Sequence, residues 1–366
     1  MTANMNKPTG KPAKAASKIK RTLLTVGIMV AILATSICGI RIYNSHKYSA
    51  PSESSFPRYY ADPADLSLYP KNLDGITVSE VHHGTAQGFH LVSNQDSLKA
   101  KRRGIIITYG GSEGTPGYEN AVQFTQNGYE VLALFMFGQP NQPQTLSRIP
   151  LEQFEDALEY INEKTTSTSP ITVVAASKGA EYALNLATKY PQISNLILIS
   201  PSAYTFAGLD FEEYGSSWTY QGHELPFIDI KRSSLPVFLR DVITPLLAHS
   251  PITYKNIYNS AVASDQEIAT KTISIKDTEA RILILAGEDD CMWDSPAMAK
   301  AIQAERPANV TVQVYTDAGH LLTGRSYINA GDTVVCVGGR VQANHRAFIE
   351  SNELILKTLE QWHRRS

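Results

Sequence analysis

Short apolar runs of strand length recur along this chain and alternate with helical patterns. We expect strands over residues 104–109, 129–135, 171–176, 196–200, 281–286 and 310–315. Apolar residues at helical spacing predict helices over 119–127, 151–162, 179–189, 296–305 and 343–362. Fully apolar strands that alternate with amphipathic helices predict an α/β protein, with a mostly parallel sheet covered by helices on both faces.

Length and charge narrow the class of protein. The chain has 366 residues, of which 43% are hydrophobic, so it can bury a large core. It carries 33 Lys and Arg against 35 Asp and Glu, a net charge of −2. Nucleic-acid binding usually needs a basic excess, so we expect no nucleic-acid partner.

The N-terminus differs from this average. The first acidic residue is Glu53, whereas six basic residues precede an uncharged, mostly apolar run from Thr22 to Ile40, which Arg41 ends. A helix over 22–40 is long enough to cross a bilayer. The basic residues on its N-terminal side predict that residues 1–21 form a cytoplasmic tail. The catalytic part would then lie outside the cytoplasm, in a single-pass membrane protein.

Two other interpretations of the apolar run stay open. A cleaved signal peptide has the same basic start and apolar run, although no clean A-x-A site follows here. A buried core helix would also be apolar. We favour an uncleaved signal-anchor.

The remaining chain divides at composition changes. Residues 41–100 are predicted to form a linker and a short β lead-in, with two strands within 76–93 joined by Gly84 and Gly88. Residues 101–366 carry the regular strand and helix pattern. Within them, 201–275 is rich in aromatic residues and Pro and has no clear strand. We expect an insertion there, over the carboxyl edge of the sheet, where such folds bind ligands.

A serine follows the predicted strand 171–176 directly. The sequence Ala175-Ala176-Ser177-Lys178-Gly179 has the form A-x-S-x-G, with small residues on both sides of the serine. A tight strand-to-helix turn requires small residues there and exposes the hydroxyl at its apex. The alternative is a serine that only caps a helix.

A serine nucleophile needs a base, and the base needs an orienting acid. The strand over 281–286 runs into Gly287-Glu288-Asp289-Asp290, and the strand over 310–315 runs into a loop that contains His320. The order Ser, Asp, His, each after its own strand, predicts a triad of Ser177, Asp290 and His320.

Two backbone N–H groups are candidates for an oxyanion hole. One belongs to Lys178, at the start of the helix. The other belongs to the Gly-rich loop that begins at Gly110, where we expect Gly111 or Ser112 to donate, Gly111 being our choice. Phosphate-binding patterns do not match this loop.

We expect neither a metal nor a cofactor. His82 and His83 are adjacent on a predicted strand, so their rings point to opposite faces. Cys291 and Cys336 are both expected near the site. Outside the cytoplasm they could form a disulfide between the acid loop and the histidine loop; whether they pair stays open.

From Gly110 onward the chain resembles the C-terminal catalytic domain of acyl-CoA thioesterases and bile acid-CoA:amino acid N-acyltransferases. The matching segments are SKGAE at 177–181, PLEQFE at 150–155, GEDD at 287–290 with Trp293 and Ser295, AGH at 318–320, and Gly338-Gly339 before the last helix. The resemblance implies an α/β-hydrolase fold and the same Ser177, Asp290 and His320. In that family Ser at the elbow accompanies thioester hydrolysis, and Cys accompanies amino-acid conjugation.

The sequence departs from this family in two ways. The stretch before the first hydrolase strand is too short for the β-sandwich that precedes this domain in the family. Family members are typically intracellular, whereas this chain begins with a predicted membrane segment. Because coenzyme A is a cytoplasmic metabolite, an outward-facing domain would be separated from acyl-CoA.

The sequence therefore predicts a membrane-anchored α/β-hydrolase that hydrolyses a small-molecule acyl thioester, with acyl-CoA as the family's substrate. The insertion 201–275 is expected to form the acyl pocket. One alternative is a hydrolase of carboxylic esters or peptides outside the cytoplasm. The other is a non-catalytic binding protein that keeps the fold.

Overall fold

A central sheet of eight strands organises the chain. The computed structural model describes residues 12–49, 56–99 and 102–364. The sheet has the order β1-β2-β4-β3-β6-β7-β10-β11. Its strands are β1 (Ile76–His83), β2 (Ala86–Ser93), β3 (Ile105–Tyr109), β4 (Val131–Leu134), β6 (Ile171–Ala176), β7 (Ile193–Ile199), β10 (Arg281–Gly287) and β11 (Val310–Tyr315). β2 is antiparallel to β1 and β4, and all other neighbours are parallel. The predicted mostly parallel sheet is confirmed.

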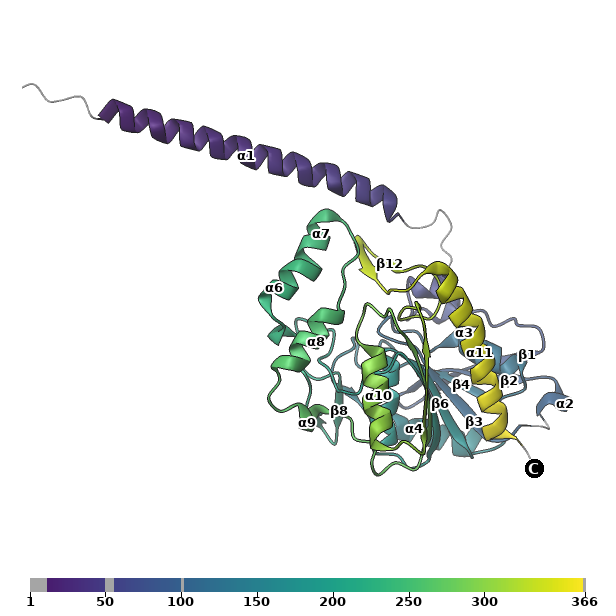
Figure 1. The fold of residues 1–366 in the computed structure, drawn as a ribbon. Helices are drawn as coiled ribbons and strands as arrows, with labels where there is room; N and C mark the ends of the chain where they lie inside the picture. Colours follow the sequence, from purple (N-terminus) through teal and green to yellow (C-terminus); the bar gives the residue numbers. More distant parts are fainter. Residues whose placement is uncertain (1–11, 50–55, 100–101, 365–366) are drawn as a thin grey trace, which may run out of the picture.

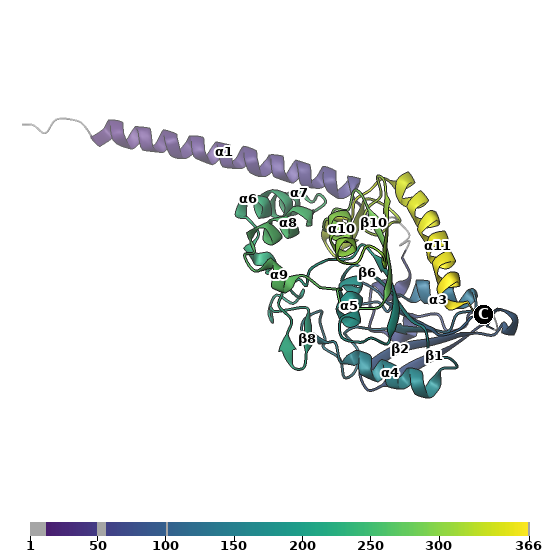
Figure 2. The same cartoon turned by 60° about the horizontal axis from the view of Figure 1, so that its bottom comes forward.

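Helices cover both faces of this sheet (Figures 1 and 2). One face packs against α4 (Gln153–Lys164), α5 (Lys178–Ala187) and α10 (Ser295–Glu305), and the other against α3 (Tyr118–Gln126) and α11 (Val341–His363). Alternate residues of each strand enter opposite cores: Ile105 and Ile107 face one side and Ile106 the other. The continuous apolar runs follow from this double burial.

The lead-in before the parallel strands is part of the folded core. β1 and β2 form the expected pair, with His83 opposite Ala86 at the turn. Gly84 lies in this turn as expected, whereas Gly88 lies within β2, opposite Val81. Upstream lie η1 (Arg58–Tyr60) and η2 (Leu66–Leu68), and α2 (Asp96–Lys99) follows β2. The buried ring of Tyr69 stacks on Tyr59 at 4.4 Å and contacts Phe89 at 4.9 Å. Much of the segment predicted as linker therefore packs against the sheet; residues 50–55 and 100 lie outside the described residues.

The insertion 201–275 has more structure than the sequence predicted. It holds β8 (Trp218–Tyr220), β9 (His223–Glu224), η3 (Ile230–Arg232), α6 (Leu235–Phe238), η4 (Leu239–Ile243), α7 (Thr244–Ala248), α8 (Lys255–Ser264) and α9 (Ile268–Lys271). The expectation of no strand was wrong, because β8 pairs with β5 (Ile149–Pro150) and β9 with β8. These strands have two or three residues each, too few to produce a periodic pattern. A second hairpin, β12 (Tyr327–Ala330) and β13 (Thr333–Cys336), separates the His320 loop from α11.

A long helix, α1 (Pro12–Lys47), precedes the domain and contains the predicted 22–40 segment. Among the described residues, one helical stretch, Lys18–Lys47, is long and apolar enough to cross a membrane; a signal sequence can meet the same criteria. The side chains of its apolar part are exposed. Residues 1–11 of the predicted basic tail lie outside the described residues.

The end of α11 is fixed to the sheet by a buried histidine. The Nδ1 atom of His363 lies 2.6 Å from the carbonyl oxygen of Arg103, and Nε2 lies 2.7 Å from the hydroxyl of Thr172. A carbonyl only accepts, so Nδ1 carries the proton and Nε2 accepts from Thr172. Burial lowers the pKa of His363 to about 4, and the nearby arginines contribute in the same direction.

This histidine makes stability depend on pH. A lowered folded-state pKa means that the stabilisation is complete above the ordinary value of 6.5 and is lost as pH falls toward about 4. The difference between 6.5 and about 4 corresponds to about 3 kcal/mol. We predict that urea unfolding of the full chain in detergent will give a free energy that declines over this range, and that His363→Gln will decline less. Parallel curves for the two proteins would contradict this role.

Candidate active site

Ser177 occupies the turn between β6 and α5. Its backbone has φ 54° and ψ −122°, a region that non-glycine residues rarely adopt. Two hydrogen bonds hold this conformation: its N–H donates to the carbonyl of Ile199 (2.9 Å), and its carbonyl accepts from the N–H of Glu181 (3.1 Å). The turn presents the Ser177 side chain at the carboxyl edge of the sheet, as the elbow pattern predicts.

The glycine after the serine is required by a close backbone approach. A Cβ atom on Gly179 would lie 1.9 Å from the carbonyl oxygen of Gly110, on the loop after β3. No side chain fits there unless the loop moves. The last position of A-x-S-x-G therefore lets the elbow helix pack against the Gly-rich loop.

The structure brings Ser177, His320 and Asp290 together in one hydrogen-bonded chain. Ser177 Oγ lies 2.9 Å from His320 Nε2, and His320 Nδ1 lies 2.8 Å from Asp290 Oδ2. Asp290 follows β10 and His320 follows β11. Asp290 and His320 are 1% and 3% exposed, whereas Ser177 is partly exposed. The geometry fits a nucleophile, a base and an orienting acid.

The acid is fixed by further donors. Asp290 Oδ1 accepts from the backbone N–H groups of Met292 (2.8 Å) and Trp293 (3.2 Å). These bonds hold the carboxylate in place and leave Oδ2 for the imidazole.

His320 is held in place through both its ring and its backbone. The Trp293 ring meets His320 edge-on at 5.4 Å, and Trp293 Nε1 donates to the carbonyl of Ser200 (3.1 Å). Ser200 Oγ donates to the His320 carbonyl (2.6 Å), and the His320 N–H donates to the carbonyl of Val337 (2.7 Å). The ring therefore faces Ser177 in a packed, hydrogen-bonded setting.

The two predicted oxyanion donors differ in their surroundings. The N–H of Lys178 is the first of α5, so the helix itself offers it no acceptor. Gly111 lies against Ser177, since a Cβ on it would be 3.2 Å from Ser177 Cβ. Its N–H, however, donates to both carboxylate oxygens of Glu113, at 2.9 and 3.0 Å. This contact was not predicted, and it means that Gly111 can serve an oxyanion only after Glu113 moves away.

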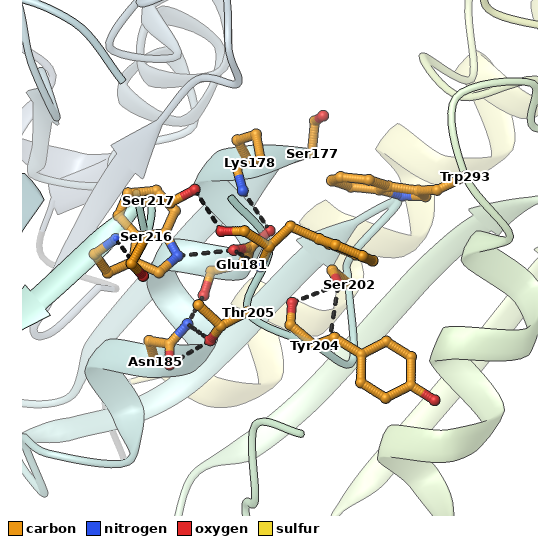
Figure 3. A network of polar contacts seen from close by, with 12 residues as sticks. Ser177, Lys178, Glu181, Asn185, Ser202, Tyr204, Thr205, Ser216, Ser217 and Trp293 are labelled. Atoms are coloured by element: carbon orange, nitrogen blue, oxygen red, sulfur yellow. Dashed lines mark hydrogen bonds and ion pairs between the residues drawn. The ribbon is translucent and has the colours of Figure 1, made fainter. Parts of the chain in front are cut away.

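A buried ion pair lies directly below the elbow and was missed by the sequence analysis. Lys178 Nζ lies 2.8 Å from Glu181 Oε2, and both side chains are almost fully buried. Glu181 Oε1 accepts from the N–H of Phe206 (3.0 Å) and from Trp218 Nε1 (2.9 Å). Figure 3 shows this network beneath Ser177. It joins α5 to the start of the insertion. The available signal was a lysine and a glutamate in an otherwise largely apolar helix.

Burial dominates the ionisation of this pair. It lowers the pKa of Lys178 and raises the pKa of Glu181, because each charged form loses its water. The attraction between the two charges opposes both changes, and the donors from Phe206 and Trp218 oppose the rise in the pKa of Glu181. Three donors on a buried carboxylate are the arrangement that burial of such a group requires.

The two cysteines expected near the site lie next to each other as free thiols. A hydrogen bond from Cys336 lowers the pKa of Cys291, whereas the same contact raises the pKa of Cys336. Cys291 follows Asp290, and Cys336 ends β13. Their pairing as a disulfide stays a prediction.

The two adjacent histidines have protein partners. His82 contacts Gln87 and Glu80, at 2.9 and 3.0 Å. His83 lies 3.5 Å from Glu159. Among the described residues there is no group of three or more His, Cys, Asp or Glu side chains placed to hold a metal ion.

Comparison with known sequences identifies the family. A family model described as BAAT / Acyl-CoA thioester hydrolase C terminal matches residues 149–361, more than half of the chain. The chain belongs to this family. The expected membership is confirmed.

Curated relatives of this family member are acyl-CoA thioesterases. Human acyl-coenzyme A thioesterase 1 is 24% identical over 224 residues, which cover 60% of this chain and 48% of the relative. Mouse peroxisomal succinyl-coenzyme A thioesterase is 26% identical over 266 residues, covering 69% and 58%. The chain spans about half the length of the curated relatives it matches.

Solved structures of low identity share the fold. Acylaminoacyl peptidase from Pyrococcus horikoshii aligns with a TM-score of 0.50 at 10% identity, covering 81% of this chain and 43% of that one. Carboxyl esterase 2 from Tuber melanosporum gives 0.50 at 12%, covering 88% and 98%. The expected α/β-hydrolase fold is confirmed.

Proposed function

We propose that this protein is a serine-dependent hydrolase of acyl thioesters. The observation that carries the proposal is the hydrogen-bonded chain from Ser177 through His320 to Asp290, in a member of a family whose relatives are named acyl-CoA thioesterases. In this proposal Ser177 is the nucleophile, His320 the general base and Asp290 the orienting acid.

The hydrogen bonds support a definite order of proton transfers. A carboxylate only accepts, so Asp290 fixes the proton of His320 on Nδ1 and leaves Nε2 to accept from the Ser177 hydroxyl. Ser177 Oγ attacks the acyl carbonyl while Nε2 takes its proton. The imidazolium then gives that proton to the leaving thiolate, and an acyl-serine remains. Water, deprotonated by Nε2, releases the carboxylic acid and restores Ser177.

The oxyanion of each tetrahedral intermediate needs donors. We assign the N–H groups of Lys178 and Gly111 to this role. The Lys178 side chain takes no direct part, because it is buried against Glu181. The Gly111 N–H becomes available once the Glu113 carboxylate is displaced.

A second candidate function rests on α1. If the helix is a membrane anchor with a cytoplasmic N-terminus, the catalytic domain lies outside the cytoplasm and apart from coenzyme A. We therefore keep a carboxylic-ester or peptide hydrolase as the alternative. A non-catalytic binding protein is the less favoured one, because it would not need Ser177 and His320 in hydrogen-bond contact.

We predict that Ser177→Ala and His320→Ala will each lower kcat by about 10⁴-fold or more, and Asp290→Ala by less. The assay compares palmitoyl-CoA and acetyl-CoA with p-nitrophenyl esters, using the full chain in detergent. Ser274→Ala, an exposed serine far along the chain, is the matched control. A fluorophosphonate probe should label the wild type and not Ser177→Ala.

The outcomes of this assay separate the three functions. Release of coenzyme A that depends on Ser177 supports the thioesterase. Ester cleavage without release of coenzyme A supports the alternative hydrolase. Absence of both turnover and labelling would leave the non-catalytic protein.

Removing the competing carboxylate should help the reaction. A hydrogen bond to a charged group contributes about 1.5–3 kcal/mol, less at an exposed site such as Glu113. We predict that Glu113→Ala will raise kcat/KM for p-nitrophenyl acetate by about threefold to tenfold, whereas Glu159→Ala, also exposed, will not. An unchanged rate would argue against Gly111 as a donor, and a reduced rate would mean that Glu113 supports the loop.

We also propose that α1 is an uncleaved anchor, with residues 1–21 in the cytoplasm and the catalytic domain outside. The chain is tagged at both ends and produced in cells. Protease is then added from outside, under conditions that let it reach the outer side of the membrane that α1 would span while this membrane stays closed. We predict loss of the C-terminal tag and protection of the N-terminal tag. The reverse pattern would contradict the orientation, and a mature protein that starts after residue 40 would support the cleaved signal peptide.

A further inference from the structure

One helical segment of the insertion exposes an apolar face. Residues 235–248, which comprise α6, η4 and α7, are called the apolar segment below. Five of its large apolar side chains are between 40% and 65% exposed: Leu235, Phe238, Leu239, Leu246 and Leu247. Leu235, Phe238 and Leu239 have the i, i+3, i+4 spacing of one helix face, and Leu246 and Leu247 follow in α7, beside α1. Clustered apolar side chains on a surface usually mark a contact with another partner or with a membrane.

The apolar segment is bound to the end of α1. Arg41 Nη1 donates to the carbonyls of Leu246 (3.0 Å) and Leu247 (3.3 Å), and Asn44 Nδ2 donates to the carbonyl of Ala248 (2.8 Å). These are the last carbonyls of α7, where a helix runs out of its own N–H donors. That of Leu246 also accepts from the N–H of His249 (3.4 Å). In both views the apolar segment lies beside the C-terminal part of α1 (Figures 1 and 2).

A second contact holds α1 from another side. The ring of Tyr48 meets Tyr327 of β12 edge-on at 5.2 Å, and Asn329 Nδ2 donates to the Tyr48 carbonyl (3.1 Å). The domain is thus attached to α1 at two places. Tyrosine at the end of a membrane helix is typical of the interface between lipid and water.

The position of Arg41 indicates that the exposed apolar face contacts a membrane. Arg41 ends the uncharged run, so in a membrane-spanning α1 it lies where the hydrocarbon meets the headgroups. The carbonyls it binds belong to Leu246 and Leu247, whose side chains are exposed. The apolar face is therefore held at the depth of the interface.

The apolar segment is connected to the candidate active site by backbone hydrogen bonds. The chain after α7 bonds to β13 through Ile252, whose N–H donates to the carbonyl of Val334 (2.9 Å). It also bonds to the residue after Asp290, since the N–H of Tyr254 donates to the carbonyl of Cys291 (3.0 Å). The acid loop and the hairpin beside His320 therefore lie next to the segment.

We propose that residues 235–248 form a membrane-contact surface, whose exposed apolar side chains enter the interfacial layer of the bilayer beside α1. It seats the active site against the membrane and gives it access to long-chain acyl substrates dissolved there. The contact itself rests on the proposed anchoring by α1, and the access rests on the proposed hydrolase activity.

The contact can be measured without any assay of activity. The full chain is placed in nanodiscs whose lipids carry brominated acyl chains, which quench tryptophan on contact. Phe238→Trp places a reporter in the apolar segment. Phe348→Trp, 47% exposed on α11, is the matched control. We expect at least twofold stronger quenching at position 238 than at 348, after subtraction of the wild-type signal.

Two results would overturn the contact. Equal, weak quenching at both positions would mean that the segment stays in water. A reporter at 238 that is shielded from aqueous acrylamide but not quenched by lipid would mean that a second copy of the chain covers the face.

A second measurement tests the access. The variant Leu239→Ser, Leu246→Ser, Leu247→Ser keeps the backbone carbonyls that bind Arg41 and removes apolar side chains. We expect kcat/KM for palmitoyl-CoA in nanodiscs to fall at least tenfold, with p-nitrophenyl acetate unchanged. The control Val341→Ser, Ile349→Ser alters comparably exposed side chains on α11.

The outcomes separate this inference from the proposed function. An equal fall for both substrates, or no fall for either, would overturn the access. A wild type that cleaves neither substrate would contradict the hydrolase and leave the quenching result to decide the contact.

Discussion

The buried carboxylate of Glu181 joins the two parts of the molecule on which the site depends. It lies on the first turn of the elbow helix and accepts from Lys178, from the backbone of Phe206 and from the indole of Trp218. A charge taken out of water is tolerated only when such partners surround it, and loss of one partner leaves an uncompensated buried group, at a cost of about 3–5 kcal/mol. The serine turn and the insertion are therefore stabilised together.

This coupling explains why Lys178 occupies the position after the nucleophile. Its backbone N–H is the first of α5, while its side chain turns down into the core toward Glu181. One residue thus contributes an amide to the proposed site and an ion pair to the packing below it. The family resemblance at SKGAE reflects both contributions. Ser177 contacts His320, Gly179 allows the close approach of Gly110, and Glu181 pairs with Lys178.

The candidate triad could be predicted from sequence because each member follows its own apolar strand. Parallel strands end at one edge of a sheet, so Ser177, Asp290 and His320 were expected to meet once the strands were assigned. The need for a small residue at Gly179 could also be predicted, since a tight strand-to-helix turn leaves no room for a larger side chain. The contact of Glu113 with Gly111 could not be predicted from the sequence, because it depends on the conformation of one loop. The strands β8 and β9 were too short for periodicity. The hairpin β12–β13 lies between β11 and α11 and is outside the regular alternation of strands and helices, so that alternation did not predict it.

If α1 spans a membrane, its attachment to the domain at two places affects how the protein meets a substrate dissolved in the lipid. Arg41 and Asn44 on one side, and Tyr48 on the other, hold the helix against the domain, so the domain does not tumble independently of α1. A membrane enzyme attached in this way searches in two dimensions. Its rate then follows the mole fraction of substrate in the lipid and falls on dilution with inert lipid, even when the amount of substrate per volume is constant.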